Sequence, residues 1–207
     1  RPERQRRGIA AFALAAAITV VPPATCAAQP LMPANLRVQG LDAPPTAALR
    51  VAAGVWTTAA ELAALPTTGA AWEQLRTAAN QLVPTPNLSN QDDESNVIVM
   101  AKGLVHARLG EERYREEVIA ACMAIIGTED GGRTLALGRE LAAYVIAADL
   151  VGLPEAEDSR FRAWLRTVLT KPLDGRTLSS TQEDRPNNWG THAGASRAAV
   201  AVYLGDR

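Results

Sequence analysis

The sequence predicts an all-α fold built from consecutive antiparallel helix pairs, and three observations support this prediction. Hydrophobic residues make up 47% of the 207 residues but aromatic residues only 4%, and alanine, the most frequent apolar residue, favours helices over strands. Apolar residues recur at spacings of three and four in successive segments, which are joined mostly by short turns. No segment shows the strict alternation that is typical of a half-buried strand. Helix pairs of this kind stack in a solenoid or around a closed toroid.

The first 55 residues differ from this pattern and are expected to precede the folded domain. Residues 1–28 have the order of a secretory signal peptide, with a basic start, an apolar run from Ile9 to Val21 and small residues up to Ala28. The apolar run is shorter than the roughly 20 residues that cross a bilayer. Residues 29–55 form a proline-rich lead-in, and residues 56–207 are expected to form one domain. We therefore expect a secreted or periplasmic protein that leaves the membrane after cleavage of the signal peptide.

Helix boundaries in the domain follow from capping residues, glycine and proline. Thr58 and Glu61 have the spacing of a capping box, and Pro66 ends the short helix that they open. Gly110 and Gly127 are expected to follow two later helices as C-terminal caps. The expected helices span residues 58–65, 70–82, 91–109, 111–126, 135–150 and 155–170, and a last helix begins near residue 192.

Three of these helices have apolar faces that predict core residues. Cys122, inside an apolar run, is interpreted as one of them. The expected core residues are Val97, Met100, Ala101, Leu104 and Val105; Tyr114, Val118, Ala121, Cys122 and Ile125; and Phe161, Trp164, Leu165 and Val168. The apolar face from Val200 to Leu204 has no following helix to cover it, so we expect a toroid that is incomplete at its C-terminal end.

The connection from Thr170 to His192 is the exception among the short turns. A structureless segment of about 20 residues in a compact domain is usually functional or disordered. Arg185-Pro-Asn-Asn-Trp-Gly190 is dense in turn-forming and hydrogen-bonding groups and contains Trp189, which favours an ordered loop. The loop leads into a helix N-terminus, where free backbone N–H groups attract anions. This loop is therefore the candidate site.

Three stretches of the domain carry a family resemblance. They are Asn87-Leu-Ser-Asn-Gln-Asp-Asp93, Gly132-Arg-Thr-Leu-Ala-Leu-Gly-Arg139 and Glu183-Asp-Arg-Pro-Asn-Asn-Trp-Gly-Thr-His-Ala-Gly-Ala-Ser-Arg197. Together they resemble the alginate lyase-like family of bacterial polysaccharide lyases, and the resemblance extends over about residues 56–206. It implies an (α/α) toroid that cleaves alginate or a related uronic-acid polymer by β-elimination. The family also has a catalytic Tyr and Arg on later helices, which we expect beyond Arg207.

The resemblance and the chemistry of β-elimination together suggest site residues. Asn188 matches the family's carboxylate-binding Asn, whereas Trp189 stands where better-known members have His. His192, three residues later, is suggested by chemistry alone as a base or as a group that neutralises the substrate carboxylate. The alternative for both asparagines is a turn or helix-capping role. The expected catalytic residues are Asn188 and His192, and the expected substrate-binding residues are Asn187, Trp189, Arg185, Arg197 and Arg139.

Two other functions remain open at this point. A glycoside hydrolase would need paired carboxylates, and Asp92, Asp93, Glu183 and Asp184 are candidates, although Asp92-Asp93-Glu94 is most simply an acidic first helical turn. A non-catalytic carbohydrate-binding protein is the second alternative, because Trp189 replaces the family's His. The net charge of −1 argues against nucleic acid as a partner. No residues have the spacing of a metal site, no cofactor is expected, and the expected partner is an anionic polyuronate.

Overall fold

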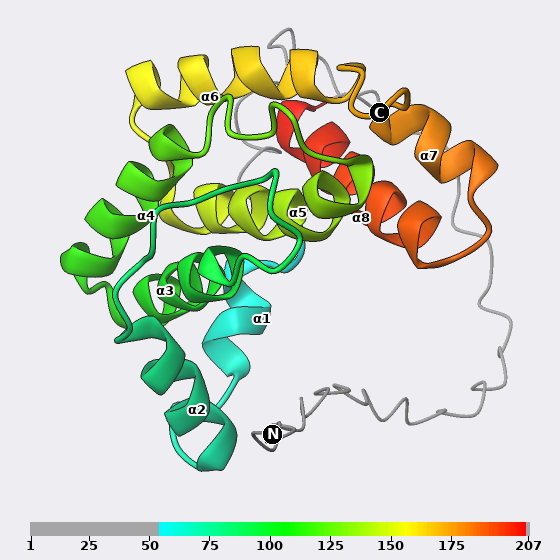
Figure 1. Cartoon of the computed structure of the whole chain (residues 1–207). Coiled ribbons are helices and arrows are strands. Elements are labelled where there is room, and N and C mark those ends of the chain that lie inside the picture. Colours follow the sequence, from blue (N-terminus) through cyan, green and yellow to red (C-terminus); the bar gives the residue numbers. More distant parts are fainter. Residues whose placement is uncertain (1–53, 206–207) are drawn as a thin grey trace, which may run out of the picture. The chain divides into compact units, whose positions relative to one another are not determined.

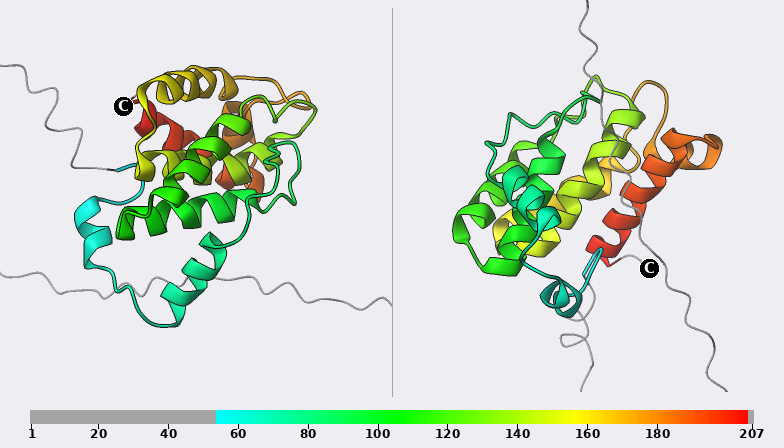
Figure 2. Two further views of the ribbon diagram at one scale, coloured as in Figure 1. Left: turned by 90° about the vertical axis from the view of Figure 1, so that its left-hand side faces the viewer. Right: turned by 90° about the horizontal axis from the view of Figure 1, so that it is seen from below.

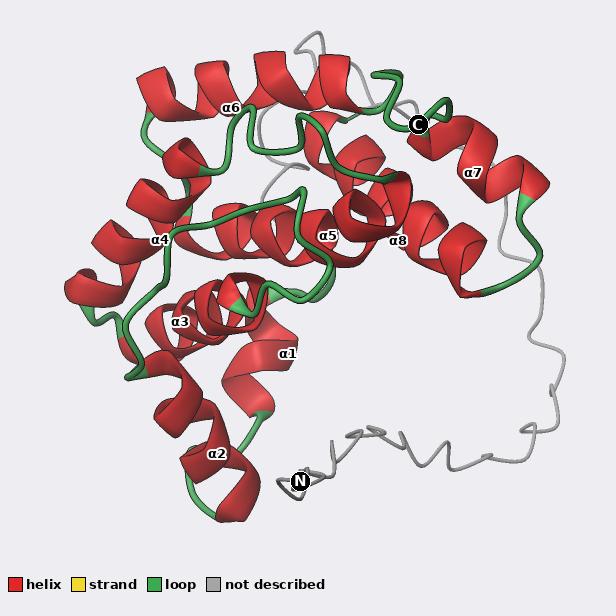
Figure 3. Ribbon diagram, viewed as in Figure 1, coloured by secondary structure: helices red, strands yellow, loops and turns green. Residues whose placement is uncertain are grey.

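The computed structural model describes residues 54–205, in which the regular structure is helical (Figure 3). The described range contains no strand beyond an isolated bridge between Leu173 and Arg176. The all-α prediction is therefore confirmed. The expected signal peptide and nearly all of the lead-in lie outside the described residues. The helices are α1 (Ala59–Ala64), α2 (Ala70–Ala79), α3 (Ser95–Leu109), α4 (Glu112–Ala124), α5 (Thr134–Val151), α6 (Glu155–Val168), α7 (Leu178–Asp184) and α8 (Asn188–Leu204).

The helices of the described domain are arranged in two layers (Figures 1 and 2). Helices α3, α5 and α8 form an inner row, in which α5 packs against α3 on one side and α8 on the other. Helices α4, α6 and α7 lie on the outer side of this row. Among consecutive helices, α2 packs on α3, α3 on α4, α4 on α5 and α7 on α8. This packing of neighbouring helices is consistent with part of an α/α toroid.

The hydrophobic core lies between these layers and confirms two of the three predicted helix faces. Every core residue predicted for α4 and α6 is buried. The prediction for α3 was partly wrong, because Val97 is 58% exposed while Ile98, Val99 and Lys102 are buried. Helix α3 contacts α1, α2, α4 and α5. Since these neighbours surround it, its buried surface is wider than the single stripe that periodicity predicts.

The segment from Thr170 to His192 is more regular than the sequence suggested. Helix α7 forms within it, because Thr177 Oγ1 accepts a hydrogen bond from Ser180 N (3.0 Å) and Thr177 N donates one to Ser180 Oγ (3.1 Å). This is a capping box with serine in place of the usual Glu or Gln. Helix α8 begins at Asn188, before the predicted start near His192, because the Asn187 side chain caps it. The expectation of a long structureless loop is therefore wrong.

The C-terminal apolar face is also covered, contrary to expectation. Val200, Tyr203 and Leu204 are buried. The Tyr203 ring meets the Phe161 ring of α6 edge-on, with centroids 5.8 Å apart, and Arg162 of α6 donates a hydrogen bond to the Tyr203 carbonyl oxygen at 2.6 Å. Helix α6 therefore supplies the partner that the sequence did not reveal.

The loops that precede α3 and α5 pack on one another. Leu88 is fully buried, and its N–H donates to Thr128 Oγ1 at 3.1 Å. A Cβ on Gly132 would lie 2.6 Å from the Cα atom of Ser89, so this close approach requires glycine. Asp93 precedes α3 and accepts a hydrogen bond from the backbone N–H of Ser95 (2.8 Å). The acidic residues 92–94 therefore lie before the helix instead of forming its first turn, which corrects the sequence interpretation.

Candidate active site

The beginning of α8 places the two candidate catalytic residues on one helix face. Asn187 Oδ1 accepts a hydrogen bond from Trp189 N at 3.1 Å, which makes Asn187 the cap of the helix. Asn188 and His192 follow at positions i and i+4, which face the same way on an α-helix. The capping alternative therefore holds for Asn187. Asn188 is exposed, and its amide makes no hydrogen bond within the described residues.

His192 and Arg139 lie on α8 and α5, at the place where these two helices cross closely. Ser196 Oγ donates to the Gly138 carbonyl oxygen (2.8 Å) and accepts from Ala142 N (3.1 Å), which fixes the register of the two helices. Burial, followed by the nearby Arg139 guanidinium, lowers the pKa of His192 below its usual 6.5. A neutral imidazole at neutral pH is the form that accepts a proton.

Glu140 is a site residue that the sequence analysis missed. Its side chain is 2% exposed, Oε1 lies 4.0 Å from Arg139 Nε, and Oε2 has no hydrogen-bond partner within the described chain. Burial raises the pKa of Glu140 to about 7, with Asp93 and Asp92 raising it further and Arg139 opposing them. With a pKa of about 7, Glu140 is ionised in only about half of the molecules at neutral pH, so it balances the positive charge of Arg139 only in part.

A buried polar network next to Glu140 was also missed. Tyr144 lies one helical turn after Glu140 on α5, and its hydroxyl is hydrogen-bonded to Ser95 Oγ at 2.6 Å. Ser95 Oγ also donates to Asp93 Oδ1. Burial raises the pKa of Tyr144 well above its usual range. The network ties the start of α3 to the middle of α5, so that the Asp92–Asp93 loop is held near Glu140.

The remaining predicted substrate-binding residues lie in other surroundings. Arg185 Cζ is 5.4 Å from the centroid of the Trp189 ring, and both residues line a cavity of about 220 Å³ with Arg133 and Arg176. The residues that line this cavity do not include Asn188, His192 or Arg139. Arg197 binds back to α7, with Nη1 2.7 Å from Gln182 Oε1 and 3.7 Å from Glu183 Oε1. The predicted site residues thus form two groups, around His192 and around Arg185, with Arg197 in neither.

The carboxylates considered for a hydrolase are mostly engaged elsewhere. Asp184 forms an ion pair with Arg176 (3.2 Å), and Glu183 lies near Arg197. Asp93 accepts a hydrogen bond from Ser95.

Within residues 54–205 no group of three or more potential ligand side chains is placed to hold a metal ion. No helix in the same range is long and apolar enough to span a membrane.

An all-α domain of paired helices, with α3, α5 and α8 in an inner row, has the arrangement expected for part of an α/α toroid. The sequence model of the alginate lyase family matches residues 98–207, which is more than half of the chain and includes both groups of site residues. The chain belongs to this family, and the family places it among the polysaccharide lyases. No curated protein and no solved structure matched the chain.

Proposed function

We propose that the protein cleaves a uronic-acid polysaccharide, with alginate as the first candidate, by β-elimination. One observation carries the proposal beyond family membership. Asn188 presents an exposed amide, without a hydrogen bond within the described residues, on the same face of α8 as His192, whose pKa is lowered by burial and by the charge of Arg139. Amide, guanidinium and neutral imidazole are the groups that this reaction needs.

The reaction begins with removal of the weakly acidic proton at C5 of a uronate, next to its carboxylate. Negative charge then develops on the carboxylate, and preorganised donors that neutralise it lower the barrier. The Asn188 amide and the Arg139 guanidinium supply such donors. Because Glu140 is only partly ionised near pH 7, its competition with the substrate carboxylate for Arg139 is reduced.

His192 serves as the base in this proposal. Its neutral imidazole accepts the C5 proton, and the bond from C4 to the leaving oxygen breaks with formation of a C4–C5 double bond. The three tyrosines of the chain, Tyr114, Tyr144 and Tyr203, are buried. Within residues 54–205 none of these tyrosines is placed to protonate the leaving oxygen, and the protonated His192 is the group in this range that can return the proton.

The proposal is tested by incubating the protein with alginate, polymannuronate and polyguluronate. A lyase produces an unsaturated sugar that absorbs in the near ultraviolet, whereas a hydrolase produces reducing ends without this absorbance. Asn188→Ala and His192→Ala should abolish most of the absorbance change, and Gln74→Ala, an exposed amide on α2, is the matched control. Reducing ends without absorbance would favour the hydrolase, and binding without either product would favour a carbohydrate-binding protein.

We also propose that the protein acts outside the cytoplasm, secreted or in the periplasm. The support is the signal-peptide order of residues 1–28, together with a polymeric substrate too large to enter cells. The mature protein should begin near Ala28 or Gln29. Sequencing its N-terminus from a secreting host checks this, and a mature chain that begins at Arg1 or Ile9 would contradict it.

A further inference from the structure

The cavity beside Arg185 concentrates positive charge. Three arginines, Arg133, Arg176 and Arg185, line its volume of about 220 Å³ together with Trp189, and Asp174 is the acidic residue among the lining groups. The chain as a whole has a net charge of −1. This local excess of arginine is therefore a feature of the site and does not follow from the overall composition.

The three arginines differ in whether a carboxylate balances the charge of their guanidinium groups. Arg133 Nε lies 3.3 Å from Asp174 Oδ2, and both side chains are about two-thirds exposed, at 65% and 64%. Arg176 Nη1 lies 3.2 Å from Asp184 Oδ2. Arg185 has no carboxylate partner within the described residues, and its buried Nε has no hydrogen-bond acceptor there. Arg185 is therefore the arginine of this cavity whose charge no carboxylate balances within the described residues, and an anion that enters the cavity would pair with its guanidinium.

The walls of the cavity are held in place independently of any ligand. A tight turn, with hydrogen bonds between Leu173 and Arg176 in both directions (2.7 and 3.1 Å), places Asp174 at its tip with φ of 50°. Lys171 pairs with the buried Glu129 at 2.7 Å, which joins the loop before this turn to the loop before α5. On the other wall, Thr181 Oγ1 donates to Thr134 Oγ1 at 2.8 Å, joining α7 to α5.

Trp189 positions Arg185 from the remaining side. The guanidinium lies over the indole ring, and a Cβ on Gly190 would lie 2.0 Å from the Arg185 carbonyl oxygen, so α8 begins in direct contact with this residue. An arginine held by an aromatic ring presents its planar fork in a fixed orientation, which suits a carboxylate better than a flexible lysine would.

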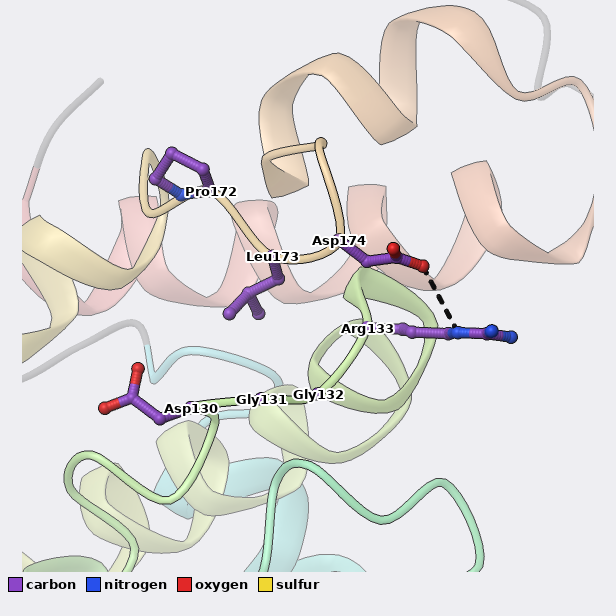
Figure 4. A pocket seen from close by; sticks show the side chains of 7 residues that line it. All are labelled: Asp130, Gly131, Gly132, Arg133, Pro172, Leu173 and Asp174. Carbon is purple, nitrogen blue, oxygen red and sulfur yellow. Dashed lines mark ion pairs between the residues drawn. The ribbon is translucent and has the colours of Figure 1, made fainter.

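The Arg133–Asp174 pair lines both this cavity and a second one of about 380 Å³, drawn in Figure 4. Both cavities are lined by Arg133, Leu173 and Asp174. The Asp174 carboxylate points toward the Arg133 guanidinium in this view. Because the pair is exposed and contributes little to stability, a ligand carboxylate can take the place of Asp174 on Arg133.

We propose that the cavity lined by Arg133, Arg176 and Arg185 is a subsite that binds the carboxylate of an acidic sugar unit other than the unit being cleaved. This proposal rests on the proposed function for its ligand class. It assigns Arg185 and Trp189 to binding of the polymer instead of to chemistry. Loss of the subsite should therefore raise KM while kcat is retained.

The test uses D-glucuronate, an acidic sugar without a glycosidic bond, so that binding is measured without turnover. The readout is the indole N–H resonance of Trp189 in an NMR titration, assigned by its absence from the Trp189→Phe variant. D-glucuronate should shift this resonance, whereas D-glucose should not. The shift should persist in Asn188→Ala, which removes the proposed catalytic contact but no lining residue of the cavity.

Arginine variants with a matched control complete the test. Loss of one charge-assisted hydrogen bond should weaken glucuronate binding about tenfold in Arg176→Gln and Arg185→Gln. Binding should be unchanged in Arg160→Gln, an exposed arginine of α6. The subsite would be overturned if D-glucose shifted the resonance equally, or if glucuronate did not shift it at all. It would also be overturned if inorganic sulfate bound as tightly as glucuronate, or if Arg185→Gln kept full binding.

The outcomes separate this inference from the proposed function. If the polymer is cleaved but glucuronate does not shift Trp189, the subsite is wrong and the lyase activity stands. If glucuronate shifts Trp189 but no polymer is cleaved, the cavity binds acidic sugars and the lyase activity is wrong. Melting temperatures of all variants show whether a loss of binding reflects a loss of folding.

Discussion

Gly138 of α5 packs directly against the backbone of Ala193 of α8. A Cβ on Gly138 would lie 3.0 Å from the backbone nitrogen of Ala193 and 3.2 Å from its Cα atom. Both neighbours are backbone atoms, so the clash is relieved only if the helices separate. The same contact sets the distance between Arg139 and His192, which follow and precede these two residues in the sequence.

Gly138→Ala should therefore reduce both stability and activity. Overpacking of this kind typically costs about 1–3 kcal/mol of the free energy of unfolding, and displacement of α8 moves His192 away from Arg139. Urea unfolding and the lyase assay measure the two effects. The control is Gly194→Ala on α8, where the three atoms nearest to the new Cβ belong to the Gln182 side chain, at 3.4–3.6 Å. If Gly138→Ala behaves like this control, the crossing is not tight.

Asn187 and Asn188 should respond to alanine in opposite ways. Asn187 caps α8, so Asn187→Ala should lower the free energy of unfolding by about 1 kcal/mol and leave turnover per folded molecule intact. Asn188→Ala should leave the melting temperature unchanged and lower kcat by about 10²–10³, the usual effect of losing one preorganised donor. A destabilised but fully active Asn188→Ala would remove the main support for the proposed site.

The Ser95–Tyr144 hydrogen bond should stabilise the fold, because removal of one partner leaves the other as a buried polar group without this hydrogen bond. Ser95→Ala leaves the buried Tyr144 hydroxyl without this partner, which should lower the free energy of unfolding by about 1–3 kcal/mol. The double variant Ser95→Ala/Tyr144→Phe should recover part of this loss, because it removes both polar groups. A double-mutant cycle measured by urea unfolding gives the interaction energy, and strictly additive effects would contradict the network.

The raised pKa of Glu140 predicts that the stability of the folded chain falls as pH rises toward neutrality. Its pKa is about 7 in the folded chain and about 4.5 in the unfolded chain, so the folded chain keeps a proton that the unfolded chain releases between these values. The free energy of unfolding contributed by Glu140 should fall as pH rises from about 4.5 to about 7, by at most about 1.4 kcal/mol per pH unit.

The measurement for Glu140 compares urea unfolding of the parent and Glu140→Gln at about pH 5 and about pH 8. The neutral amide of the variant has no proton to release, so the difference in stability between the two proteins should change in its favour as pH rises. A constant difference would mean that Glu140 is ionised in the folded chain across this range.

The parts of the fold that were predictable from sequence are those fixed by local signals. The capping box of Thr58 and Glu61 forms as expected, with Glu61 N donating to Thr58 Oγ1 at 3.1 Å. The predicted faces of α4 and α6 are buried because each of these outer helices contacts the core on one side only. Burial raises the pKa of the Cys122 thiol to about 12, consistent with its interpretation as a core residue.

The parts that escaped prediction depend on contacts between distant segments. Glu140 lies in an apolar stretch, but nothing local shows that its neighbours come from the loop before α3. The capping box of α7 uses Ser180, which is a weaker signal than Glu or Gln. The cavity lined by arginines brings together Arg133, which precedes α5, and Arg185, which follows α7. Its one sequence signal was the density of hydrogen-bonding residues before α8.

The pH dependence of cleavage provides the sharpest test of His192 as the base. Because burial and Arg139 lower the pKa of His192, the acid limb of kcat/KM should lie below pH 6.5. Arg139→Gln removes the repelling positive charge, so the pKa of His192 should rise and the limb should move to higher pH, while kcat falls through loss of a carboxylate contact. The limb should remain in Glu140→Gln, since it belongs to the imidazole and not to the buried carboxyl. The measurement is the initial rate of unsaturated-product formation at low substrate across the pH range, for the parent and both variants. An acid limb that disappears in Glu140→Gln, or that stays in place in Arg139→Gln, would show that His192 is not the group whose ionisation controls the reaction.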